Sequence, residues 1–281
     1  MIVEPARRDD FLALMQGTYG AAMSVPEFEW WFDRNPGGPR ILNEARDDDG
    51  TPLGVLAMSC SRMSQGLAAF AVHAVTTPAA RGRGVFSALE LENEEQAAAA
   101  GAPWALGFTN PLAGPILVGR LGWEDVTSLR IWVRPKRLKR RGTGRLRVDP
   151  EVPGFDQARS LPAHHIVRDP MYLNWRYTDS PRAYVRVDDV VVTHAMWHGF
   201  SSAVICEGGS TRSLHRACAL VDADIAVAIV NPGEARTYLA AGFVPSPRTI
   251  RFIGKRLTAE AAPLPKQRAA WHFSLGDLDF F

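Results

Sequence analysis

The stretch that most constrains the fold is Thr76–Leu89, in which two arginines alternate with two glycines. A short apolar run typical of a buried strand, Ala68–Val75, precedes it. A run rich in Leu, Ala and Glu follows and stops at Ala100–Pro103, so the pattern predicts a strand, a turn and a helix. Glycines let backbone N–H groups approach an anion closely, and a helix start adds unpaired donors and a positive dipole end. The sequence therefore predicts a phosphate-binding turn.

The spacing of residues within this turn distinguishes between known phosphate-binding motifs. A dinucleotide-binding turn requires a third glycine, but Gly82 and Gly84 are followed by Ser87. A Walker loop requires Gly-Lys-Ser or Gly-Lys-Thr, which this segment lacks. Neither device matches the sequence.

A third device fits better. The segment resembles the pyrophosphate loop of the GNAT superfamily of acyl-CoA N-acyltransferases, which reads Gln/Arg-x-x-Gly-x-Gly/Ala after a strand. Arg81 and Gly84 match its first two fixed positions, and Thr76–Pro78 resembles the Val-x-Pro-like segment before it. Phe86 stands where the superfamily has Gly or Ala, so we expect an altered loop at that end.

A second block strengthens the resemblance. Trp104–Thr109 is a further apolar run that predicts a buried strand. It is followed by Asn110, Ala113 and Leu121–Trp123, which are similar to the superfamily block Asn-x-x-Ala…Leu-Gly-Phe/Trp. In that superfamily the strand separates from its neighbour here and opens the acyl channel.

The resemblance implies an α/β (α+β) fold with a mixed, mostly antiparallel sheet flanked by helices. A weak internal sequence repeat suggests two tandem GNAT-like units. Trp30–Pro36 resembles Trp175–Pro181, and Asn110–Trp123 resembles Asn231–Phe243. We predict an acyl-CoA-binding domain at 1–140, a basic and Pro-rich linker at 141–165 and a degenerate second unit at 166–281. That unit has no counterpart of Arg81–Gly84.

The resemblance also implies a function. It is N-acyl transfer, most simply acetyl transfer, from acetyl-CoA or another acyl-CoA to a primary amine of a small molecule or an amino-acid-like acceptor. A non-catalytic acyl-CoA-binding or regulatory module is the alternative. The residues implied to bind the donor are Val75, Thr76, Thr77, Arg81, Gly82, Arg83, Gly84, Val85, Phe86, Ser87 and Asn110.

The sequence offers two candidate catalytic residues. His73 is a candidate base because it lies on the predicted central strand, although a hydrogen-bonded core histidine has the same pattern. The chain ends in Phe281, whose carboxylate is a second candidate by resemblance to members with a C-terminal base. Val118 stands where many members have a catalytic tyrosine. The glutamates after the turn are predicted to form a solvated helix face; they are Glu90, Glu92, Glu94 and Glu95.

The composition excludes several other classes. Three cysteines, Cys60, Cys206 and Cys218, lack metal-ligand spacing and do not form a disulfide framework, so we expect no metal. No apolar run reaches the ~18 residues of a membrane span, and the start has no signal-peptide core, so we expect a cytoplasmic protein without a membrane partner.

The charge pattern gives little support to a polyanion partner. The net charge is +2, and the most basic segment, Lys136–Arg147, contains no aromatic platform. A solvated connector explains it better than a nucleic-acid site. Nothing in the sequence decides between a monomer and a homodimer.

Overall fold

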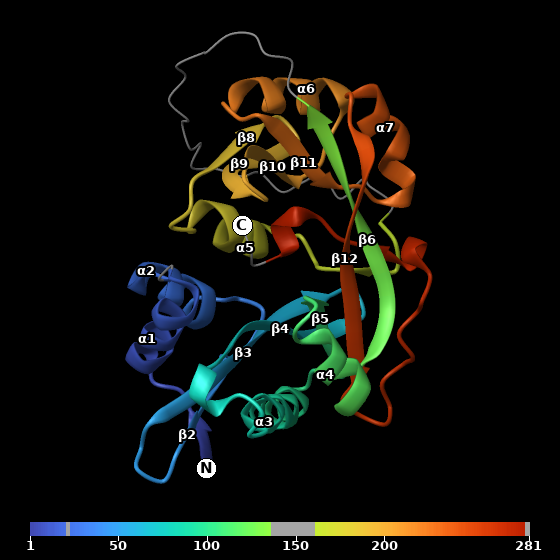
Figure 1. Cartoon of the computed structure of the whole chain (residues 1–281). Coiled ribbons are helices and arrows are strands. Elements are labelled where there is room, and N and C mark those ends of the chain that lie inside the picture. Colours follow the sequence, from blue (N-terminus) through green and yellow to red (C-terminus); the bar gives the residue numbers. More distant parts are fainter. Residues whose placement is uncertain (21–22, 136–160, 279–281) are drawn as a thin grey trace. The chain divides into compact units, whose positions relative to one another are not determined.

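The computed structural model describes residues 1–20, 23–135 and 161–278 (Figure 1). The described chain divides into two units, and each contains two separate segments. Unit 1 comprises Met1–Val126 and Phe252–Pro265, and unit 2 comprises the described parts of Thr127–Arg251 and Lys266–Phe281.

This division differs from the predicted domains at 1–140 and 166–281. The boundaries fall inside β6 (Glu124–Pro135) and β12 (Val244–Arg256), so both strands contribute residues to both units. Most of the predicted linker lies outside the described residues. Its end forms β7 (His164–His165), which pairs in parallel with β13 (Trp271–His272) in unit 2. The prediction assumed contiguous domains, and a strand shared between units gives no break in the sequence pattern.

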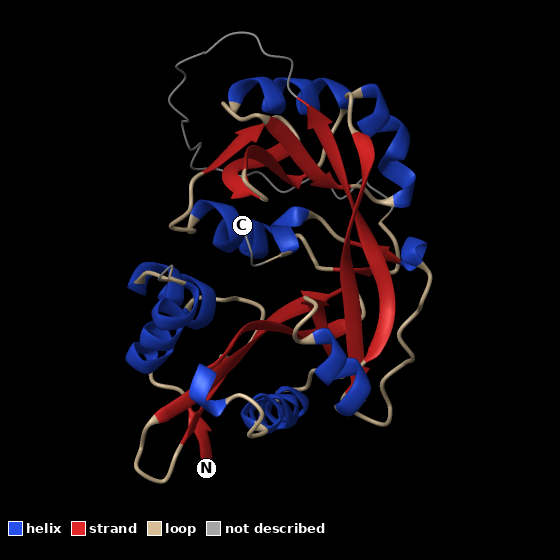
Figure 2. Ribbon diagram, viewed as in Figure 1, coloured by secondary structure: helices blue, strands red, loops and turns tan. Residues whose placement is uncertain are grey.

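Unit 1 is built on a mixed sheet in the order β1-β2-β3-β4-β5, with the last part of β12 beside β5 (Figure 2). The first four strands are antiparallel, whereas β4 and β5 are parallel. The strands are β1 (Ile2–Pro5), β2 (Ile41–Arg46), β3 (Pro52–Met63), β4 (Gly66–Thr76) and β5 (Trp104–Thr109). The predicted strands on both sides of the glycine-rich turn are confirmed.

The described part of unit 1 also contains four α-helices, α1 (Arg8–Tyr19), α2 (Val25–Phe28), α3 (Val85–Ala99) and α4 (Gly114–Arg120), with a π-helical turn at Glu29–Asp33 and a 3-10 turn at Pro78–Ala80. Helix α3 follows the glycine-rich turn as predicted. It packs on the sheet through a buried apolar cluster that includes Leu56, Val85 and Leu89. This packing fixes the start of α3 relative to β4, which matters for the site.

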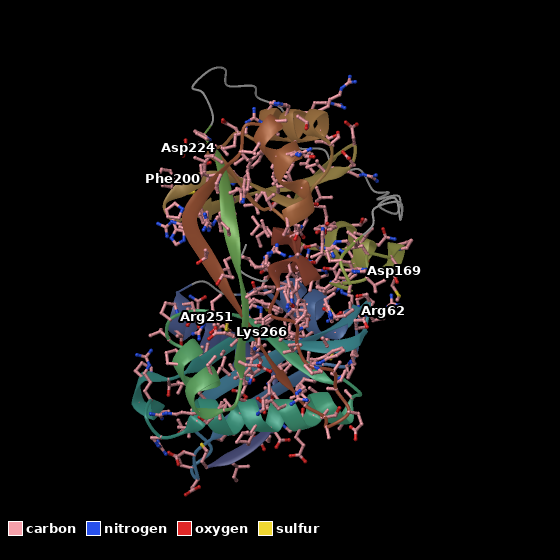
Figure 3. All side chains as sticks on the ribbon, turned by 90° about the vertical axis from the view of Figure 1, so that its right-hand side faces the viewer. Arg62, Asp169, Phe200, Asp224, Arg251 and Lys266 are labelled. Carbon is pink, nitrogen blue, oxygen red and sulfur yellow. The ribbon has the colours of Figure 1, made fainter. Side chains whose placement is uncertain are left out.

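Unit 2 repeats the arrangement of unit 1. Its sheet runs β6-β11-β10-β9-β8, and the parallel pair β10–β11 is connected by α6, as β4 and β5 are connected by α3. Its described strands and α-helices include β8 (Tyr184–Val187), β9 (Val190–Trp197), β10 (Phe200–Glu207), β11 (Ile225–Ile229), α5 (Pro170–Leu173), α6 (Thr211–Leu220) and α7 (Ala235–Ala240). Phe200 and Asp224, marked in Figure 3, lie at the starts of the parallel pair, where the Asp224 carboxylate accepts from the Ser201 N–H at 3.2 Å. The described chain thus contains two units, each with a parallel strand pair connected by a helix.

Candidate acyl-donor site

The two parallel strands of unit 1 separate at their carboxyl ends. Their pairing runs from Ala68–Trp104 to Ala71–Gly107, whereas β4 continues to Thr76 and β5 to Thr109. The predicted separation of these strands is therefore observed. The end of β4 beyond Ala71 keeps β3 as a partner on one edge only.

His73 lies at a bulge in β4. Leu56 pairs with Ala74 and Ala57 pairs with Val72, which leaves His73 outside the ladder with φ at +29°. Its ring contacts three aromatic rings at centroid distances of 6.0–6.2 Å, those of Phe11, Trp31 and Phe32. The bulge shifts the register of β4, so it decides which backbone groups face the separated side.

The backbone groups on the separated side belong to Ala74 and Thr76. The Thr77 N–H donates to the Leu53 carbonyl at 2.9 Å, which sets the alternation of an antiparallel ladder. By that alternation Val75 bonds to β3, while Ala74 and Thr76 direct their N–H and C=O groups to the other edge. The backbone N–H groups available to a ligand at this edge are consequently those of Ala74 and Thr76.

The start of α3 lies beside this edge. Gly82 and Gly84 have φ of +79° and +80°, a left-handed conformation that favours glycine. No described side chain caps α3, so the N–H groups of Val85, Phe86 and Ser87 lack partners within the helix. These groups and the helix dipole make a suitable site for an anion.

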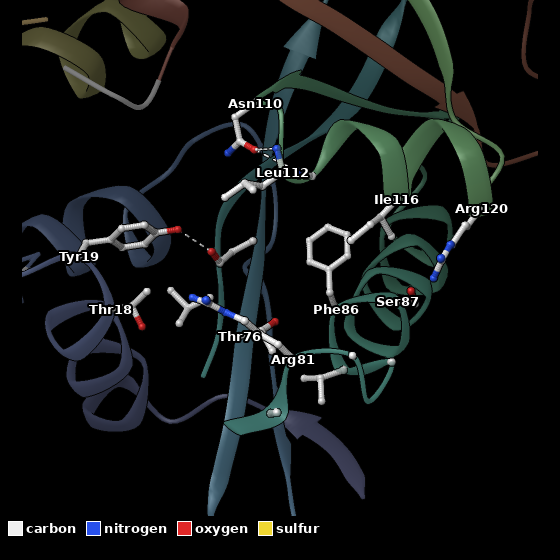
Figure 4. Close-up of a pocket in the computed structure, with 17 residues that line it drawn as sticks. Thr18, Tyr19, Thr76, Arg81, Phe86, Ser87, Asn110, Leu112, Ile116 and Arg120 are labelled. Carbon is white, nitrogen blue, oxygen red and sulfur yellow. Dashed lines mark hydrogen bonds between the residues drawn. The ribbon is translucent and has the colours of Figure 1, made fainter. Parts of the chain in front are cut away.

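A cavity of about 520 Å³ joins the start of α3 to the free edge of β4 (Figure 4). It is lined by Thr18, Tyr19, Ala74, Val75, Thr76, Ala80, Arg81, Gly82, Gly84, Val85, Phe86, Ser87, Asn110, Leu112, Ala113, Ile116 and Arg120. Two lining residues are arginines, and the described lining contains no Asp, Glu or His. The cavity is therefore electropositive.

Nine of the eleven predicted donor-binding residues line this cavity; Thr77 and Arg83 do not. The Arg83 guanidinium pairs with the Asp47 carboxylate at 3.0 Å, and this hydrogen bond lowers the pKa of Asp47. Arg83 thus ties the glycine-rich turn to the β2–β3 hairpin. Phe281 lies outside the described residues, and His73 is not part of the lining.

The sequence reasoning missed Tyr19 and Arg120. Tyr19 ends α1 and Arg120 ends α4, and in Figure 4 Arg120 lies beside Ser87 at the start of α3. A predicted helix end does not reveal which loop it will approach. The only sequence signal that placed Arg120 near the site was the Leu121–Trp123 motif that follows it directly.

The prediction of a solvated glutamate face on α3 was wrong for Glu90 and Glu94, which are both buried. Glu94 accepts from the Trp123 indole N–H at 2.7 Å and pairs with Lys255. Glu90 has no hydrogen-bond partner among the described residues, and burial, reinforced by Glu94, raises its pKa to about 8. Lys255, the partner of Glu94, belongs to a segment far along the chain, so the local sequence pattern could not indicate that Glu94 is buried.

In unit 2, the turn between β10 and α6 already holds a carboxylate from the same chain, that of Asp189. The Ser210 N–H donates to the Asp189 carboxylate at 2.8 Å, and the Ser210 hydroxyl caps α6 by accepting from the Ser213 N–H. A Cβ added at Gly209 would lie 2.3 Å from the Asp189 Oδ1 atom. Since an internal carboxylate fills the place of an anion, this turn is not arranged like that of unit 1.

Comparison with known proteins bears on the fold. No family model and no curated protein matches the sequence. Solved structures do match it. A GCN5-related N-acetyltransferase from Anabaena variabilis is 14% identical, with a TM-score of 0.61 over 92% of this chain and 73% of that one. A GCN5-related N-acetyltransferase from Kribbella flavida is also 14% identical, with a TM-score of 0.58 over 91% and 72%.

A third match is Eis1 from Mycobacterium abscessus, which is 14% identical with a TM-score of 0.56 over 92% of this chain and 74% of that one. The chain therefore has the GNAT fold, as its motifs predicted. Among the described residues, no helix is long and apolar enough to cross a membrane.

Proposed function

We propose that the chain is an acyl-CoA-dependent N-acyltransferase that transfers an acyl group, most simply acetyl, to a primary amine of a small or amino-acid-like acceptor. The observation that carries the proposal is the cavity itself. It joins an uncapped helix start, which suits a pyrophosphate, to an unpaired strand edge, which suits the amide-bearing arm of CoA.

Each part of the cavity has a role in this proposal. The pyrophosphate accepts hydrogen bonds from the N–H groups at the start of α3, and Arg81 and Arg120 balance its charge. The arm follows the edge of Ala74 and Thr76. Asn110 accepts from the N–H groups of Leu112 and Ala113 at 2.9 and 3.0 Å, which holds the turn after β5 in place.

The chemistry is direct transfer. The acceptor nitrogen attacks the thioester carbon, the C–S bond breaks, and the thiolate takes up a proton. An alkylamine has a pKa near ~10 and must lose a proton before it attacks, whereas a thiol with a pKa near ~8.5 is a fair leaving group. His73 and the carboxylate of Phe281 are proposed as bases.

Binding and turnover test the proposal. Isothermal titration with acetyl-CoA should show binding by the wild type, at least tenfold weaker binding by Arg120→Gln and no binding by Gly84→Glu, which places a carboxylate at the anion site. Arg40→Gln is a matched control, because Arg40 pairs with Asp33 outside the cavity. Equal binding by all four proteins would reject this site.

A second function is supported by one observation. The described cavity lining has no Asp, Glu or His, and Val118 stands at the position of the usual tyrosine, which favours an acyl-CoA-binding module without turnover. Thiol release measured across a broad panel of amines separates the two. Tight binding without release identifies the module, and amine-dependent release identifies the enzyme.

A further inference from the structure

A hydrogen bond from α1 crosses the cavity to the free edge of β4. Tyr19 donates its phenolic O–H to the Ala74 carbonyl at 2.8 Å, and Figure 4 shows the side chain extending toward β4. The side chain is not fixed by burial, since Tyr19 is 59% exposed. The other four tyrosines are buried: Tyr172, Tyr177, Tyr184 and Tyr238.

The Ala74 carbonyl is one of few acceptors that this edge offers to a ligand. An extended ligand that adds to a strand edge donates its amide N–H groups to such carbonyls. A carbonyl oxygen has two lone pairs, so it can accept a second hydrogen bond in addition to that from Tyr19. However, the Tyr19 side chain also lines the cavity beside this edge and takes up space that the ligand needs. The phenol and a ligand arm therefore compete for both the acceptor and the space.

We propose that Tyr19 is an internal competitor at the donor site, whose phenol holds the Ala74 carbonyl until the amide-bearing arm of the donor displaces it. This inference rests on the proposed function, because it requires an arm that follows β4. A ligand with the phosphates of CoA but without the arm binds at the start of α3 and leaves the Tyr19–Ala74 bond intact.

Two ligands and one variant test the inference. CoA carries the arm, and 3′-phosphoadenosine 5′-diphosphate carries the same phosphates without it. In Tyr19→Phe the competing hydrogen bond is lost while the ring remains, so the Kd for CoA should fall about two- to tenfold, the usual worth of one hydrogen bond. The Kd for the armless ligand should not change.

Other results of this titration overturn the inference. Unchanged or weaker CoA binding by Tyr19→Phe means that the phenol does not compete, and an equal change for both ligands means a general effect on the cavity. If neither ligand binds to the wild type, the donor site itself is rejected. Tighter CoA binding alone supports the competition.

A spectroscopic measurement on the wild-type sequence needs no variant. In protein labelled with 3-fluorotyrosine, a soluble paramagnetic agent should broaden the fluorine resonance of Tyr19 most, since the other four tyrosines are buried. CoA should shift this resonance, and the armless ligand should leave it in place. A resonance that both ligands shift equally, or that CoA does not shift, contradicts displacement.

Discussion

Replacing Glu90 with glutamine should stabilise the protein in a pH-dependent way. Glu90 lies on α3, one turn after Phe86, is 1% exposed, and neither carboxylate oxygen has a described hydrogen-bond partner. Burial is the main reason that its pKa rises from 4.5 to about 8, Glu94 adds to it, and Lys255 opposes it. The folded protein therefore holds the carboxyl group neutral at pH 7, whereas the unfolded chain ionises it.

The size and sign of the effect follow from this difference. Between pH 4.5 and 8 the folded state binds a proton that the unfolded state has lost, so the free energy of unfolding falls as the pH rises. Each pH unit is worth about 1.4 kcal/mol, which gives a loss of about 3 kcal/mol at pH 7 and about 5 kcal/mol above pH 8. Below pH 4.5 the loss disappears, because both states are protonated.

Urea unfolding at pH values from 4 to 9 measures how the free energy of unfolding of each protein depends on pH. Glu90→Gln should be more stable than the wild type by about 3 kcal/mol at pH 7, relative to its effect at pH 4. Glu95→Gln is the matched control, because Glu95 is exposed on the same helix. A constant difference between Glu90→Gln and the wild type across this range would refute the reasoning.

Two further predictions concern a strained turn and a buried ion network. Gly84→Ala meets no atom within 4 Å, so it should lower the free energy of unfolding only by the cost of left-handed backbone, about 1–2 kcal/mol; no loss in urea unfolding would exclude the strained turn. Arg168 pairs with Glu207 at 2.9 Å and Asp277 at 2.7 Å in unit 2, where all three side chains are at most 8% exposed. Arg168→Met should cost about 3–5 kcal/mol in the same assay, because it leaves two buried carboxylates without their cation; a cost below about 1 kcal/mol would contradict this.

Local patterns predicted much of unit 1. The strand Ala68–Val75, the turn and the helix after it were predicted correctly. The hydrophobic pattern, the glycines and the helix-end signals that indicate them all act within a few residues of the chain. Nine of the predicted donor-binding residues line one cavity for the same reason, since they belong to one turn and its flanking strand ends.

The errors have a common cause in long-range packing. The two units differ from the predicted domains because β6 and β12 each contribute residues to both units. Glu94 was assigned to solvent because its partner Lys255 is 161 positions further along the chain. Tyr19 was missed as part of the site because only the folded backbone brings α1 to Ala74.

A crystal structure of the protein with acetyl-CoA tests the central claim most directly. The account predicts pyrophosphate oxygens within hydrogen-bond distance of the N–H groups of Val85–Ser87, with the arm along Ala74 and Thr76 in place of the Tyr19 hydroxyl. A ligand bound elsewhere on the chain, or a cavity that stays empty at saturating acetyl-CoA, would contradict it.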